Sequence, residues 1–198
     1  GKGKGITAPN PIGQRMAMER AYQNAGIHPT EVSLLEAHGT STAAGDRVEG
    51  QLACEFYGKA GARPGSIAMG SVKSQIGHLK SGAGAASMIK AALALHDKVI
   101  PGSLHFDQPN PAIPFDDAPV QVPRATRPWE TSNGDRRVAG LSSFGFGGTN
   151  FHVVMTEHRP GTREPKVFVP PAGGGKAEGR GHIEAAGPAR PDRRVLAV

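Results

Sequence analysis

The strongest constraint on the fold of this chain is a pattern that occurs three times: a short apolar segment runs into a polar loop that contains glycine. The loops cover residues 38–42, 73–78 and 145–150, and the strand-like segments before them cover residues 32–37, 67–71 and 137–142. A further strand is expected at residues 151–156, and helices at residues 10–25, 46–57 and 82–96. This alternation predicts an α/β protein, in which loops at the ends of strands carry the functional site.

The expected helix boundaries follow from capping residues. Asn10 can accept hydrogen bonds from free amides at a helix start, Pro11 suits the first helical position, and Gly26 favours a left-handed stop. Asp46 with Glu49 three residues later resembles a capping box, which predicts that the second helix begins at residue 46.

The third helix is rich in small residues near its start and apolar further on. Met88, Ile89, Leu93 and Leu95 predict that it is buried, as a central helix of the fold. The segment that follows, residues 101–128, is rich in proline and is expected to be an ordered, extended connection without regular structure.

Composition limits the classes of protein that fit. The chain has 198 residues, of which 37% are hydrophobic, enough for one domain with a real core. Residues 159–198 are dominated by Pro, Gly and Arg, and we predict a disordered linker there. The net charge is +6, but the basic residues are spread singly along the chain, which indicates solvated charge rather than a nucleic-acid surface.

One cysteine and the lack of a long apolar run also bear on the compartment. A single cysteine cannot form an internal disulfide and fits a reducing environment. No apolar run reaches the length of a membrane span. We therefore expect a soluble, cytoplasmic protein. No set of histidines with Cys54 has metal-ligand spacing, so no metal is expected.

Three motifs carry a resemblance to a known family. Residues 36–42 read Glu-Ala-His-Gly-Thr-Ser-Thr, residues 71–78 read Ser-Val-Lys-Ser-Gln-Ile-Gly-His, and residues 143–150 read Ser-Phe-Gly-Phe-Gly-Gly-Thr-Asn. In this order and spacing they resemble the two histidine motifs and the closing glycine-rich loop of β-ketoacyl synthases. Within the family, the chain is most similar to ketosynthases of multidomain polyketide and polyunsaturated fatty acid synthases.

The resemblance implies a thiolase-like layered α/β/α/β/α fold, of which residues 1–158 are the C-terminal half. It also implies that the nucleophilic cysteine lies in an upstream half, before Gly1, so that this chain alone is inactive. Cys54 is expected to be a buried helical cysteine instead, because nothing in its surroundings favours a thiolate.

In the family, the reaction is a decarboxylative Claisen condensation between a carrier-bound malonyl-type unit and an acyl chain. By resemblance, His38 and His78 donate Nε2–H groups to the oxygen of the enolate that forms, a type of stabilisation that often dominates catalysis. Lys73 matches a lysine that tunes the site electrostatically. Phe146 matches a gating aromatic residue whose backbone N–H contributes to the oxyanion hole.

Further residues are assigned to substrate binding on the same grounds. Thr40 and Thr42 match hydroxyls that bind the amides of a phosphopantetheine arm. The third motif adds Gly145, Gly147, Gly148 and Asn150, the glycines giving that loop its mobility.

One departure from the family is visible. Many stand-alone members carry a glutamate nine residues after the second histidine, whereas Ser87 stands there in this chain. The multidomain members lack that glutamate too, which supports the assignment to them and leaves the role of Lys73 less defined.

The resemblance also implies the partners. These are an acyl-carrier protein, the upstream half of the ketosynthase and a second copy of the full-length protein in a homodimer, with no nucleic acid and no membrane. Substrates arrive on the carrier's phosphopantetheine, and no cofactor is bound directly.

Three alternatives stay open. One is a non-catalytic partner protein of the chain-length-factor type, against which the retained histidines argue. A second is a thiolase-like enzyme that works on coenzyme A, and a third is a basic binding module.

Overall fold

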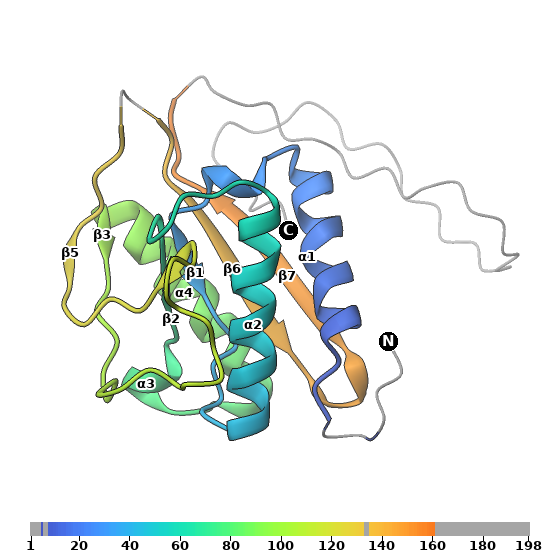
Figure 1. The fold of residues 1–198 in the computed structure, drawn as a ribbon. Coiled ribbons are helices and arrows are strands. Elements are labelled where there is room, and N and C mark those ends of the chain that lie inside the picture. The colour runs from blue at the N-terminus through green and yellow to red at the C-terminus, as the bar shows by residue number, and fades with distance from the viewer. Residues whose placement is uncertain (1–4, 6–7, 133–134, 161–198) are drawn as a thin grey trace, which may run out of the picture. The chain divides into compact units, whose positions relative to one another are not determined.

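A five-stranded sheet forms the centre of the fold, with the strand order β4-β2-β1-β6-β7 (Figure 1). The computed structural model describes residues 5, 8–132 and 135–160. The strands β4, β2, β1 and β6 are parallel, and β7 is antiparallel to β6. In sheet order, the five strands are Val120–Gln121, Ile67–Gly70, Leu34–Glu36, Val138–Phe144 and Asn150–Thr156.

Helices cover both faces of this sheet. Helices α1 (Pro11–Ala25) and α2 (Ala43–Lys59) lie on one face, and α4 (Ala83–Asp97) lies on the other (Figure 1). The short helix α3 (Lys73–Ile76) follows β2. Three single turns of 3₁₀ helix complete the connections: η1 (Pro29–Glu31), η2 (Lys80–Gly82) and η3 (Phe146–Gly148).

The two faces have separate apolar cores, because neighbouring strand residues point to opposite sides of a sheet. Leu35 packs in one cluster with Met18 of α1 and Leu52 of α2, while Leu34 packs in the other with Ala91, Ala94 and Leu95 of α4. The core under α1 and α2 also contains a polar pair, Tyr22 and Tyr57, whose hydroxyls are 2.7 Å apart. The sheet therefore holds the helices on both sides in fixed positions relative to the strand ends.

The ends of α1 are as the sequence predicts. The side chain of Asn10 accepts hydrogen bonds from the amides of Ile12 and Gly13, at 3.1 and 3.2 Å. Gly26 ends the helix in the left-handed conformation, with φ of 61°. The two capping residues therefore predict both ends of this helix correctly.

The start of α2 corrects a prediction. The helix begins three residues before the expected Asp46, with Thr42 as its N-cap, because Thr42 Oγ1 accepts a hydrogen bond from the Gly45 amide at 3.1 Å. Asp46 instead accepts from the Ser41 amide at 3.0 Å. The capping box predicted for Asp46 and Glu49 is therefore wrong, and Glu49 is available for another role.

Helix α4 is buried on one side only, which corrects the expectation of a wholly buried helix. Ala91, Ala94 and Leu95 pack against the sheet, whereas Ile89 and Leu93 are 61% and 56% exposed. Nothing in the described part of the chain covers that outer side. Two exposed branched side chains on one helix therefore mark a surface that this chain leaves open.

The proline-rich segment 101–128 contains more regular structure than expected. Val120–Gln121 pairs with β2 as an edge strand of the main sheet. Arg127–Pro128 forms β5, which pairs with β3 (Val99–Ile100) in a small antiparallel sheet. Prolines are tolerated at such edges because no ladder hydrogen bond is lost there.

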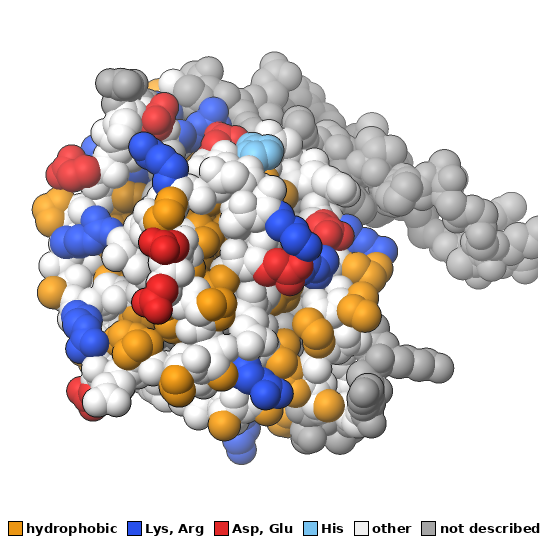
Figure 2. All heavy atoms as spheres, viewed as in Figure 1, with side chains coloured by type: hydrophobic (Ala, Val, Ile, Leu, Met, Phe, Trp, Pro, Cys, Tyr) orange, Lys and Arg blue, Asp and Glu red, His pale blue; other side chains and the backbone are white. Residues whose placement is uncertain are grey.

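Charged side chains are mixed on the face formed by α1 and α2. Figure 2 shows basic groups interspersed with acidic and apolar ones on that face. No helix among the described residues is both long and apolar enough to cross a membrane. Within the same residues, no three His, Cys, Asp or Glu side chains gather in a way that could hold a metal ion.

The chain divides into a compact unit, Gly1–His158, and a second unit that starts at Arg159. The predicted disordered linker, residues 159–198, lies from residue 161 onward outside the described residues. The assignment of residues 1–158 as half of a larger domain stays a prediction at this point.

Candidate active site

The three sequence motifs meet at one edge of the sheet. Because β1, β2 and β6 are parallel and adjacent, the loops after their carboxyl ends lie next to one another. His38 follows β1, Lys73 and His78 follow β2, and the glycine-rich loop follows β6. Segments far apart in the sequence thus form one site.

The two motif histidines face each other. The centroids of the His38 and His78 rings are 5.8 Å apart, and the ring planes are nearly perpendicular at 89°. The His38 ring also contacts Phe144, the last residue of β6, with a centroid distance of 5.9 Å. His38 is half-buried and His78 is exposed. This geometry allows both rings to approach a single small group.

A backbone amide fixes the proton of neutral His78. The N–H of Lys80 donates to His78 Nδ1 at 3.0 Å. A ring nitrogen that accepts a hydrogen bond cannot carry the proton, so the neutral ring holds it on Nε2. His78 is therefore prepared to donate a hydrogen bond from Nε2.

Burial keeps His38 neutral. Desolvation, with smaller electrostatic contributions from Lys73 and His78, lowers the pKa of His38 to about 4. Its Nδ1 atom is buried without a hydrogen-bond partner among the described residues. At neutral pH the ring is an uncharged imidazole.

Glu49 supports the backbone that carries His38. Its Oε1 accepts from the His38 amide at 2.7 Å, and its Oε2 accepts from the Gly39 amide at 2.8 Å. Glu49 is buried, and desolvation raises its pKa to about 7 although both amides oppose the shift. Sequence reasoning missed this role because the spacing from Asp46 suggested a cap.

Gly39 brings the first two loops together. Its φ is +48°, and a Cβ atom built on it would lie 2.7 Å from Cβ of Ser71, at the start of the second motif. Any other residue would meet both backbone strain and a collision here. The glycine in the first motif is thus needed for the close approach of the two histidine loops.

Lys73 lies at the start of α3 and is half-buried. Burial lowers the pKa of its ammonium group; the carboxyls of Glu36 and Glu49 oppose this effect, and Lys90 adds to it. Lys73 also contributes to the lowered pKa of His38. It therefore acts on the site through charge.

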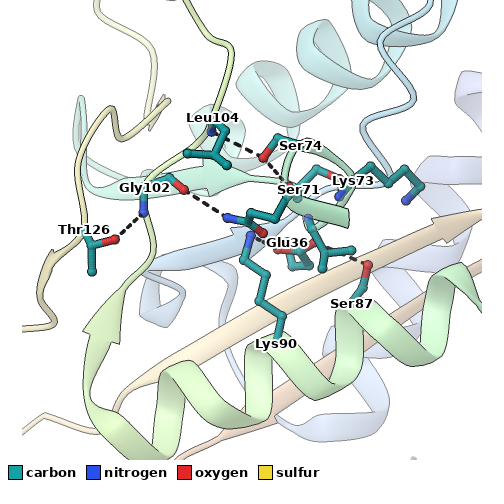
Figure 3. Close-up of polar contacts among 11 residues, drawn as sticks. Glu36, Ser71, Lys73, Ser74, Ser87, Lys90, Gly102, Leu104 and Thr126 are labelled. Atoms are coloured by element: carbon teal, nitrogen blue, oxygen red, sulfur yellow. Dashed lines mark hydrogen bonds and ion pairs between the residues drawn. The ribbon is translucent and has the colours of Figure 1, made fainter. Parts of the chain in front are cut away.

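A second buried carboxylate, Glu36, lies between α4 and the segment that carries Lys73 (Figure 3). It is 1% exposed and accepts a hydrogen bond from the amide of Val72, the residue before Lys73. The Lys90 ammonium group lies 2.8 Å from its Oε2, and the Ser87 hydroxyl donates to its Oε1 at 3.3 Å. The sequence motif contained Glu36, but nothing in the sequence singled it out.

The glycine-rich loop forms a tight turn between β6 and β7. The Gly145 amide donates to the Thr149 carbonyl at 2.7 Å, and Gly147 and Gly148 have φ of 72° and 82°. Phe146, within this turn, is 76% exposed. The turn presents an aromatic ring at the same edge of the sheet as the two histidines.

The remaining predicted binding residues differ in position. Thr40 and Thr42 have their hydroxyl oxygens 3.4 Å apart beside the His38 loop. Thr42 uses its oxygen to cap α2, which leaves its hydroxyl proton available to donate. Asn150 begins β7, and its Nδ2 is buried close to Gly13 of α1, with no hydrogen-bond partner in the described part of the chain. Its assignment as a substrate-binding residue rests on the motif alone.

Cys54 does not have the environment of a nucleophilic cysteine. It is buried within α2, and desolvation raises the pKa of its thiol. A protonated, buried thiol is a poor nucleophile. The expectation of an inert helical cysteine agrees with this environment.

Comparison with known proteins defines the family. The family "Beta-ketoacyl synthase, C-terminal domain" matches residues 1–107, more than half of the chain, and "Ketoacyl-synthetase C-terminal extension" matches residues 109–171. The chain belongs to the β-ketoacyl synthase family. The extension reaches past residue 159, into the segment predicted to be a linker.

The relatives are multidomain synthases. The chain is 46% identical over 160 residues to the polyketide synthase ThaG of Burkholderia thailandensis, a match that covers 80% of this chain and 3% of that protein. It is 43% identical over 166 residues to a polyunsaturated fatty acid synthase of Thraustochytrium sp., covering 81% and 6%. This confirms the predicted similarity to ketosynthases of polyketide and polyunsaturated fatty acid synthases.

The fold is confirmed by solved structures. The ketosynthase from module 6 of the bacillaene synthase of Bacillus subtilis matches with a TM-score of 0.77 and 39% identity, over 81% of this chain and 29% of that chain. The α/β layers described here are thus the C-terminal half of the thiolase-like ketosynthase fold. The chain spans under a third of that ketosynthase and a few per cent of the two synthases.

Proposed function

We propose that this chain is the C-terminal half of a ketosynthase domain that catalyses decarboxylative Claisen condensation in polyketide or fatty acid biosynthesis. The observation that carries the proposal is the perpendicular pair of imidazoles, His38 and His78, with 5.8 Å between ring centroids. Membership of the family supports the reaction class. Residues 1–158 form the half-domain, and residues 159–198 a linker.

The reaction has two bond-forming stages. A cysteine thiolate of the upstream half attacks the thioester of an acyl-carrier protein, forms an acyl-cysteine and releases the phosphopantetheine thiol. A carrier-bound malonyl-type unit then loses CO₂, and the electron pair of the broken C–C bond becomes an enolate. The enolate carbon attacks the acyl-cysteine carbonyl, forms the new C–C bond and expels the cysteine thiolate.

The histidines stabilise the enolate oxygen. His38 is neutral because its pKa is about 4, and the neutral form of His78 holds its proton on Nε2 because Nδ1 accepts from the Lys80 amide. Donors already in place require little reorganisation as charge develops, which makes them effective in a site shielded from water. His38 and His78 are the catalytic residues of the decarboxylation.

Lys73 and Phe146 complete the proposed catalytic set. Lys73 contributes positive potential near His38, which favours the developing negative charge and disfavours protonation of the ring. The exposed ring of Phe146 gates access, and its backbone N–H forms an oxyanion hole with the amide of the upstream cysteine.

Thr40, Thr42 and the glycine-rich loop form the proposed channel for the phosphopantetheine arm. The two hydroxyls lie beside the His38 loop, where they can pair with amides of the arm. Gly145, Gly147 and Gly148 let the loop move when the arm enters. Asn150 is included with them on the strength of the motif. No cofactor is bound directly, since the carrier supplies the arm.

The upstream half has a natural place to bind. The outer side of α4 exposes Ile89 and Leu93, and Ile76 and Leu79 beside His78 are also about half exposed. The buried Nδ1 of His38, which has no hydrogen-bond partner among residues 8–132 and 135–160, is a further group that an added element could satisfy. The proposal includes a homodimer of the full-length protein, an acyl-carrier protein as partner and a cytoplasmic location.

The proposal is tested by joining the chain to its upstream half. The joined protein should become radiolabelled by an acyl-carrier substrate and release CO₂ from a malonyl-carrier substrate, whereas the chain alone should do neither. Decarboxylation without acylation would instead favour a partner protein of the chain-length-factor type. Activity with coenzyme A thioesters but not with carrier thioesters would favour a thiolase-like enzyme and contradict the proposal.

A further inference from the structure

Glu36 is almost fully buried, at 1% exposed, and forms an ion pair with Lys90. It takes no direct part in the proposed reaction. All the polar groups around its carboxylate are donors: the Val72 amide at 2.5 Å, the Ser87 hydroxyl at 3.3 Å and the Lys90 ammonium at 2.8 Å. Such a set stabilises the ionised carboxylate, although burial raises its pKa. Two hydrogen bonds to Oε1 and one ion pair at Oε2 hold this buried carboxylate in a fixed position.

The contacts join three elements of the fold. Glu36 is the last residue of β1, Val72 lies in the loop that follows β2, and Ser87 and Lys90 belong to α4. In Figure 3 the Glu36 side chain lies between the α4 residues Ser87 and Lys90 and the segment that carries Ser71 and Lys73. One carboxylate therefore ties the sheet to a helix and to a catalytic loop.

Two proposed catalytic residues lie close in the chain to Glu36 and to its partner Val72. His38 lies two residues after Glu36 in the chain, and Lys73 lies one residue after Val72. The same segment is held further by Ser74, whose hydroxyl donates to the Ser71 carbonyl at 2.9 Å. A displacement at Glu36 would move both loops.

We propose that Glu36 is a positioning residue for the condensation, one that fixes the Lys73 loop through Val72 and the His38 loop through its own backbone. This inference rests on the proposed function and deepens it. The contact with Ser87 adds a second consequence: a carboxylate placed at position 87 on α4 could reach the same donors from the opposite side. What matters is that a carboxylate lies beside these donors, whether β1 or α4 carries it.

The exchange of the two side chains tests this. Glu36→Ser should lower the rate of malonyl decarboxylation on the order of tenfold to a hundredfold, the range for groups that orient a functional side chain. The double variant Glu36→Ser with Ser87→Glu keeps the total volume and the total charge of the pair. It should recover most of the lost rate.

The pH dependence of malonyl decarboxylation adds a second measurement, which a purely structural role of Glu36 would leave unchanged. The charged groups acting on Lys73 are Glu36 on β1, Glu49 on α2 and Lys90 on α4, with His38 influenced in turn. Glu36→Gln removes a carboxylate that raises the pKa of Lys73. The alkaline limb of the decarboxylation profile should therefore move to lower pH.

Glu157→Gln is the matched control. Glu157 forms a comparably buried ion pair with Arg137, with an N–O distance of 2.7 Å, in a part of the chain that takes no part in the site. This variant should lose thermal stability yet decarboxylate at the wild-type rate with an unshifted pH profile. It separates loss of a buried ion pair from loss of positioning.

The outcomes distinguish this inference from the proposed function. If the wild-type complete domain does not decarboxylate, the proposed function fails. If wild type is active but Glu36→Gln matches Glu157→Gln in rate and pH profile, the positioning role is wrong and the function stands. An exchange variant that folds with the wild-type Tm but stays as slow as Glu36→Ser also overturns it. Should the exchange variant not fold, the comparison of the two glutamine variants decides.

Discussion

Glu49 holds the backbone of His38 with both of its carboxylate oxygens, at 2.7 Å from the His38 amide and 2.8 Å from the Gly39 amide. This pairing joins the first turns of α2 to the loop after β1. The backbone that carries one proposed catalytic ring is therefore held by a residue eleven positions further along the chain.

Glu49→Gln should impair both folding and decarboxylation. An amide side chain presents one oxygen and one NH₂ group to two N–H donors, so one backbone donor loses its partner. A buried donor without a partner costs about 1–3 kcal/mol of stability. Thermal unfolding and decarboxylation of the complete domain measure the two effects. Glu55→Gln, on the same helix, removes only half-exposed ion pairs with Arg15 and Lys59, so it should leave decarboxylation unchanged and cost less stability. Equal behaviour of the two variants would contradict the role of Glu49.

The stability of the protein should also depend on pH through Glu49. Its pKa rises from the usual 4.5 to about 7 on folding, so between these values the folded state holds a proton that the unfolded state has lost. The free energy of unfolding should therefore fall as pH rises through this window, by at most about 1.4 kcal/mol per pH unit. Chemical denaturation at several pH values, compared with Glu49→Gln, isolates this contribution. A difference between the two proteins that does not vary with pH would refute it.

Gly39→Ala should disrupt the site more than the backbone strain alone explains. A Cβ at Gly39 adds a collision with Ser71 to the cost of a left-handed φ of 48°, which is roughly 1–2 kcal/mol for a non-glycine residue. Gly61→Ala is the control, because Gly61 also has a positive φ, of 89°, but has open space around its Cβ position. Decarboxylation should fall in the first variant and persist in the second. Equal rates in both would show that the loops need not approach so closely.

The tautomer of neutral His78 can be observed directly. Because Nδ1 accepts a hydrogen bond from Lys80, neutral His78 should carry its proton on Nε2. Long-range ¹H–¹⁵N correlation spectra of the complete domain distinguish the two tautomers. A proton found on Nδ1 would remove the donor that the proposed mechanism requires.

Local capping chemistry made much of the fold predictable. Asn10 and Gly26 defined α1 at both ends, because each satisfies backbone groups within its own turn. The start of α2 was misplaced because two sequence signals compete there, and Thr42 caps the helix instead of Asp46. The strand β4 was missed because a two-residue edge strand beside prolines has no periodic pattern.

The residues of the candidate site that belong to recognisable sequence motifs were predictable. His38, His78 and Lys73 meet at the same edge of the sheet, as expected for loops that each follow a strand in an α/β protein. The carboxylates that support them, Glu36 and Glu49, were not recognised, because their partners are backbone amides and side chains of other elements. The exposure of Leu93 was also not predictable, since an apolar helix does not reveal which of its sides packs against the sheet of its own chain.

The most direct test of the account is the rate of malonyl decarboxylation in the complete domain with His38→Ala, His78→Ala and both together. Losing one donor to a developing oxyanion typically slows a reaction by roughly a hundredfold to a thousandfold. Each single variant should show such a loss, and the double variant should lose less than the product of the two, because the rings act on one oxygen. Wild-type decarboxylation in both single variants would show that the two imidazoles do not hold the enolate.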